Sequence, residues 1–183
     1  MATSTTATPP RHSWQFGRIY APDEAWLATA VPEPILDPEL PIVDPHHHLW
    51  LRGDHPYLLD ELLADLNTGH NVVATVFEEC GSMYRAPNMS NGGPPEMRPV
   101  GETEFVNGVA AMSDSGLYGP TRVAAGIVGT ADLRLGDAVA AVLDAHLVAG
   151  GGRFRGIRLG GTWDASDAVP NHRTNPPKGL FLR

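Results

Sequence analysis

Three consecutive histidines, His46, His47 and His48, follow a short apolar stretch in Pro41-Ile-Val-Asp-Pro-His-His-His-Leu-Trp50. In an extended chain successive side chains point to opposite faces, so we expect His46 and His48 on one face and His47 on the other. Two imidazoles on one face can share a metal ion, and Asp44 could accept a hydrogen bond from a ring N–H. The alternative is a solvated histidine run, but an apolar strand before an Asp-x-His-x-His pattern favours a metal site. His46 and His48 are therefore the predicted metal ligands.

Two carboxylates, Glu78 and Glu79, come directly after the β-branched run 71–77. Carboxylates at the end of a buried strand are unusual unless they serve a site or pair with arginine. We predict that Glu79 is a catalytic carboxylate, although the register is open and a structural ion pair is an equal alternative. Cys80 follows, and with no basic residue beside it in the sequence we expect a small buried apolar side chain.

Arg158 lies near the end of a fourth apolar run, 154–159. The planar fork of a guanidinium binds the oxygens of a carboxylate or lactone through two hydrogen bonds. Arg158 is therefore the predicted substrate-binding residue. A salt bridge to Glu78 or Glu79 is an equally good interpretation of the same pattern.

Apolar periodicity predicts the elements that position these residues. Short apolar runs alternate with segments of helical spacing, an order that predicts a parallel sheet with right-handed crossovers. Pro45 cannot donate to a strand ladder, so the first strand should end or bulge there. The predicted strands are 40–45, 71–77, 123–129 and 154–159, and the predicted helices are 57–66, 102–115 and 137–149.

Composition narrows the class of protein. The chain has 183 residues, 42% apolar and 19% charged, with a net charge of −8. No lysine- or arginine-rich run is present, so neither nucleic acid nor an anionic membrane surface is an expected partner. No apolar stretch approaches a membrane span, and the single cysteine fits a cytoplasmic protein. We expect a disordered tail and N-terminal extension over 1–40 and the folded domain over 41–183.

The stretch from Ile42 to Trp50 resembles the first-strand signature of the amidohydrolase superfamily. More narrowly, it is similar to the amidohydrolase-related, metal-dependent hydrolases that include dicarboxylate and sugar lactonases. The resemblance runs from about residue 33 to about residue 175, through 74–80 and 155–158. It implies a (β/α)8 barrel of the TIM type, with the site at the C-terminal ends of the strands. Such a barrel takes about 250 residues, so an α/β fold truncated to about the first four β/α units is expected.

The resemblance also implies an activity. It predicts a hydrolase that opens a lactone or similar cyclic ester by metal-activated water, with zinc or manganese as the divalent ion. The substrate would be a small lactone or a carboxylate-bearing molecule. In relatives, further histidines and an essential aspartate come from strands five, six and eight, which this chain lacks, and histidine often stands where this chain has Leu159. Some relatives hydrolyse lactones without a metal.

Two other interpretations remain open. The chain could be a truncated, inactive half-barrel, whose exposed fourth strand would favour self-association into a homo-oligomer. A decarboxylase of the same fold is the third alternative.

Overall fold

The computed structural model describes residues 23–52, 55–90, 92–166, 168–169 and 178–180. Contacts divide the chain into two units: Met1–Glu24 with Gly160–Arg183, and Ala25–Leu159. The described part of the first unit has turns and extended segments after residue 160, where the Ser166 N–H donates to Asp164 Oδ1 at 2.7 Å. Of the predicted disordered tail and N-terminal extension over residues 1–40, residues 1–22 lie outside the described residues, and the predicted boundary at residue 41 stays a prediction.

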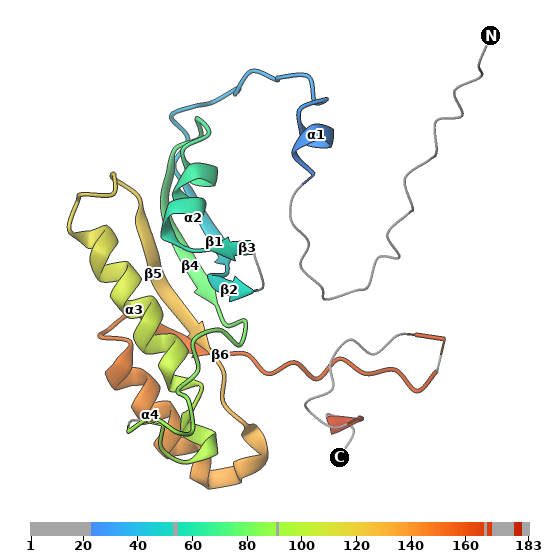
Figure 1. Cartoon of the computed structure of the whole chain (residues 1–183), viewed down its shortest axis with the longest axis vertical. Helices are drawn as coiled ribbons and strands as arrows, with labels where there is room; N and C mark the ends of the chain where they lie inside the picture. The colour runs from blue at the N-terminus through green and yellow to red at the C-terminus, as the bar shows by residue number, and fades with distance from the viewer. Residues whose placement is uncertain (1–22, 53–54, 91, 167, 170–177, 181–183) are drawn as a thin grey trace. The chain divides into compact units, whose positions relative to one another are not determined.

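Four strands of the second unit form one parallel sheet (Figure 1). The order across the sheet is β1-β4-β5-β6, so β1 and β6 are its edges. The pairing of β1 with β4 is irregular between Asp44 and His47, which confirms the expected bulge at Pro45. The parallel arrangement predicted from the β-α order is confirmed. The strands are β1 (Ile42–His47), β4 (Val72–Glu78), β5 (Arg122–Gly129) and β6 (Phe154–Ile157).

Helices connect these strands close to the positions that periodicity predicts. The Leu58 N–H, just before α2, donates to the Glu61 carboxylate at 2.8 Å, which satisfies one of the unpaired donors at the helix start. No helix in the described part of the chain is long and apolar enough to cross a membrane. The main helices are α2 (Leu59–Leu66), α3 (Val100–Asp114) and α4 (Val139–Ala149), with a short α1 (Glu24–Leu27) and 3-10 turns at Pro95–Met97 and Leu133–Ala138.

A small antiparallel sheet separates β1 from α2. Its strands are β2 (Trp50–Arg52) and β3 (His55–Tyr57), and Trp50 pairs directly with Tyr57. The sequence analysis did not predict this hairpin. Because the hairpin follows His48 immediately, it places two aromatic rings beside the histidine pair.

The predicted TIM-type barrel, truncated to four β/α units, is wrong. The described residues form an open four-stranded parallel sheet and a separate two-stranded antiparallel one. A hairpin follows β1 before the first crossover helix, and the described chain has no helix after β6. Closing a sheet into a barrel requires matched strand number, tilt and stagger, which alternating β and α segments do not specify. The α/β class itself holds.

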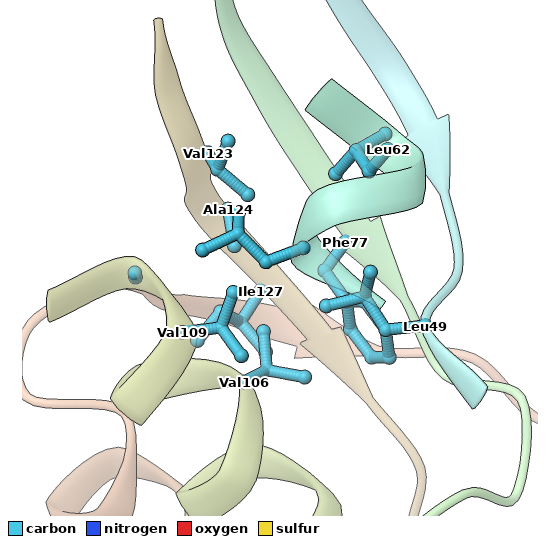
Figure 2. Packing of buried hydrophobic residues seen from close by; sticks show 10 residues of the cluster. Leu49, Leu62, Phe77, Val106, Val109, Val123, Ala124 and Ile127 are labelled. Atoms are coloured by element: carbon cyan, nitrogen blue, oxygen red, sulfur yellow. The ribbon is translucent and has the colours of Figure 1, made fainter. Parts of the chain in front are cut away.

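The core lies between the sheet and helices α2 and α3 (Figure 2). Phe77 and Ile127 are fully buried at the centre of the sheet and are register partners on β4 and β5. Leu62 of α2 and Val106 of α3 pack against this strand layer. The C-terminal end of β4, which carries Glu78, is therefore anchored by a rigid apolar layer.

Candidate metal-binding site

The imidazoles of His46 and His48 face each other at the end of β1. Their Nε2 atoms are 3.3 Å apart, and the ring planes lie at 84°. His47 between them is 6% exposed and points into the core, where its ring contacts Phe77 edge-on. The predicted alternation of the three histidines is confirmed.

The distance between the two Nε2 atoms fits a shared metal ion. Zinc binds imidazole nitrogen at about 2.0–2.1 Å in tetrahedral geometry, which places two ligand nitrogens about 3.3–3.4 Å apart. The observed 3.3 Å agrees with that separation. In the structure the two atoms are within hydrogen-bond distance of each other, and a shared ion would replace that direct contact.

The hydrogen bond on the far side of the His48 ring determines which ring nitrogen carries the proton. Its Nδ1 lies 2.7 Å from the Glu78 carbonyl oxygen. A carbonyl only accepts, so Nδ1 carries the proton and Nε2 keeps its lone pair. Burial lowers the pKa of His48, which favours the neutral ring that a metal requires. A backbone carbonyl behind a ligand histidine is the usual support of a metal site.

Asp44 supports the site differently from the prediction. Its carboxylate accepts the backbone N–H of His46 at 3.0 Å, so it bonds to the chain and not to an imidazole ring. This contact lies within the irregular part of β1 and holds the segment that carries His46.

His47 has its own partner inside the core. Its Nε2 lies 2.9 Å from the Thr75 hydroxyl, which also accepts the Ala124 N–H at 2.9 Å. A hydroxyl can donate one hydrogen bond and accept two, so either ring tautomer of His47 satisfies this contact. Burial lowers the pKa of His47 to about 4. His47 is therefore a packed core residue.

Glu79 and Arg158, the predicted catalytic and substrate-binding residues, bind each other. The Arg158 Nε donates to Glu79 Oε1 at 2.9 Å and lies 3.6 Å from Glu78 Oε2. A second guanidinium nitrogen donates to the Glu79 backbone carbonyl. This is the geometry of the ion-pair alternative, and the catalytic and substrate-binding roles stay predictions. The charge of Arg158 also contributes to lowering the pKa of His48, so the two pairs are neighbours.

The loop after β4 is held by Glu102, a residue that the sequence analysis did not single out. Glu102 is 2% exposed, and its Oε1 accepts the backbone N–H groups of Cys80 at 3.0 Å and Ser82 at 2.8 Å. Burial raises the pKa of this carboxyl. Because Glu78 and Glu79 directly precede this loop, Glu102 positions the end of β4. A lone glutamate near a predicted helix start gave no sequence signal for that contact.

A cavity of about 530 Å³ lies against the histidine pair. His46, His48 and Asp44 line one part of it, while Trp50 and Tyr57 from the hairpin line another. These two aromatic residues were not predicted to line the site, because the hairpin that carries them was not predicted. The signal available was the Gly53-Asp54 dipeptide between two short runs, a typical two-residue hairpin connection.

Within the described residues, no group of three or more His, Cys, Asp or Glu side chains is arranged to hold one metal ion. The candidate site therefore consists of two histidine ligands with a defined supporting carbonyl. No protein-family model, curated protein or solved structure matches this chain.

Proposed function

We propose that this chain is a metal-dependent hydrolase that opens a lactone or a similar cyclic ester, with His46 and His48 as ligands of zinc or manganese. The observation that carries the proposal is the 3.3 Å separation of their Nε2 atoms, combined with the Glu78 carbonyl behind His48. The resemblance of residues 42–50 to the amidohydrolase-related enzymes supports the same reaction class.

A divalent ion bound by two imidazoles would lower the pKa of a coordinated water toward about 7 and polarise an ester carbonyl. The chain's own groups would do the rest. The Glu78 carbonyl keeps the His48 ring oriented, and Asp44 holds the backbone of His46. The adjoining cavity has room for a small ring-shaped substrate.

Glu79 and Arg158 have the chemistry for the remaining roles. In this proposal Glu79 accepts a proton during the reaction, while Arg158 donates hydrogen bonds to the developing charge on the lactone oxygen. Their ion pair would have to open partly, since Arg158 now donates to Glu79 Oε1 at 2.9 Å. The substrate would also have to reach beyond the cavity, because neither residue lines it.

A second candidate is a chain that binds metal without turnover. The observation in its favour is that Glu79 and Arg158 satisfy one another, so neither is committed to a substrate.

Lactone hydrolysis, followed by acid release with and without added zinc or manganese, tests the proposal. We expect metal-dependent turnover that a chelator abolishes, and a loss of at least about 100-fold in kcat/KM for His46→Ala and for His48→Ala. His55→Ala is the matched control, because His55 lies on β3 outside the cavity wall. Turnover unaffected by chelation and by both variants would contradict the proposal, and metal binding without turnover would support the second candidate.

A further inference from the structure

The wall of the cavity beside the histidine pair carries a large aromatic surface. Trp50 and Tyr57 both line the cavity, and their rings stack with centroids 5.2 Å apart and planes at 28°. Leu62 and Leu66 of α2 add apolar surface. Flat rings pack well against such surfaces, so the cavity suits a planar apolar ligand.

The charged groups of the same wall are acidic. Asp44 and Asp65 line the cavity, whereas no lysine or arginine of the described chain does. The Tyr57 hydroxyl donates its proton to the Asp65 carboxylate, so it does not offer that hydrogen bond to a ligand. An anionic ligand would face these like charges without a counter-charge from the wall, and such juxtaposition is unfavourable.

Two neighbouring arginines are engaged elsewhere. Arg52 donates to the Cys80 carbonyl and lies over the Trp50 ring at 5.7 Å from its centroid. Arg158 is held by Glu79, with Glu78 close by. Neither arginine lines the cavity, so a carboxylate bound there would have no guanidinium beside it.

From these observations we infer that the cavity binds a planar, uncharged aromatic lactone and discriminates against a lactone that carries a carboxylate. The inference rests on the proposed function for its choice of a lactone, and it narrows the substrate class from lactone or carboxylate to the neutral form.

Isothermal titration of the full chain with coumarin and with a carboxylate-bearing coumarin tests this inference without relying on turnover. Each titration is run on the purified chain and again after chelation, because a metal ion at the histidine pair would itself attract a carboxylate. In the chelated protein we expect neutral coumarin to bind at least about tenfold more tightly than the carboxylate-bearing coumarin. Tyr57→Ala should weaken binding of the neutral probe, because it removes half of the stacked wall.

Asp65→Asn should lower the affinity ratio of the neutral over the carboxylate-bearing probe several-fold, because it removes one of the two negative charges of the cavity wall. Asp60→Asn is the matched control, since Asp60 lies exposed on the same helix outside the cavity wall. Equal or tighter binding of the carboxylate, an unchanged preference in Asp65→Asn, or no binding of either probe overturns the inference. Binding of coumarin by a chain that hydrolyses no lactone would refute the proposed function while leaving the cavity assignment in place.

Discussion

The histidine between the two candidate ligands should make the stability of this protein sensitive to acid. His47 is 6% exposed, and its Nε2 lies 2.9 Å from the Thr75 hydroxyl. Protonation of the ring would place a charge in the core. For this reason the folded chain holds the ring neutral, and burial lowers its pKa from 6.5 to about 4.

The magnitude follows from proton linkage. The unfolded chain binds a proton at His47 near pH 6.5, whereas the folded chain does so only near pH 4. The stabilising effect is therefore complete above pH 6.5 and is lost as the pH falls toward 4. Between pH 7 and pH 5 the loss in free energy of unfolding amounts to about 2 kcal/mol.

Urea unfolding followed by circular dichroism at pH 7 and pH 5 measures this loss. His47→Gln keeps a polar side chain that can hydrogen-bond to Thr75 but cannot titrate, so the change in its free energy of unfolding between pH 7 and pH 5 should be smaller than that of the natural chain by about 2 kcal/mol. The difference isolates His47, because His48 and His146 also have lowered pKa values and remain in both proteins. If the free energy of unfolding falls by the same amount between pH 7 and pH 5 in His47→Gln and in the natural chain, His47 is not the source of the acid sensitivity.

Three further predictions concern packing, reactivity and the loop after β4. A Cβ at Gly101 would lie 2.6 Å from a backbone nitrogen, whereas one at Gly108 of the same helix meets nothing within 4 Å. Gly101→Ala should therefore lower the free energy of unfolding by about 2 kcal/mol and Gly108→Ala raise it by up to about 1 kcal/mol; similar urea midpoints would disprove the packing argument. Burial raises the pKa of the Cys80 thiol to about 12, so iodoacetamide at pH 8 should modify it at least about 100-fold more slowly than free cysteine; rapid labelling of the folded chain would contradict this. Glu102→Ala leaves the N–H groups of Cys80 and Ser82 without their acceptor and should lower the free energy of unfolding by about 2–4 kcal/mol. Glu102→Gln should recover most of this loss in the same unfolding assay, and an equal loss in both variants would contradict the role of the contact.

Much of the fold could be predicted because local patterns encode it. The leucine spacing of α2 and the β-branched run of β4 identify a helix and a buried strand on periodicity alone. Strand alternation likewise predicts that His46 and His48 share a face, and the structure confirms it. Such features depend only on neighbours along the chain.

Features that depend on distant contacts could not be predicted in the same way. Whether a parallel sheet closes depends on tilt and stagger across all its strands, which the β-α order does not specify. The barrel that the family resemblance implied is therefore an open sheet in the structure. Proline disfavours a strand because it cannot donate to a ladder, yet Pro56 is tolerated in β3 because the outer side of this two-stranded sheet is unpaired. The partnership of Glu79 with Arg158 joins residues far apart in the sequence, and spacing alone left it as one of two alternatives.

A zinc titration of the purified full chain by calorimetry tests the proposed metal site most directly. We expect one ion per chain, with zinc affinity reduced at least about tenfold by His46→Ala and by His48→Ala and unchanged by His55→Ala. The same zinc affinity in all four proteins would contradict the claim that the facing Nε2 atoms of His46 and His48 form a metal site.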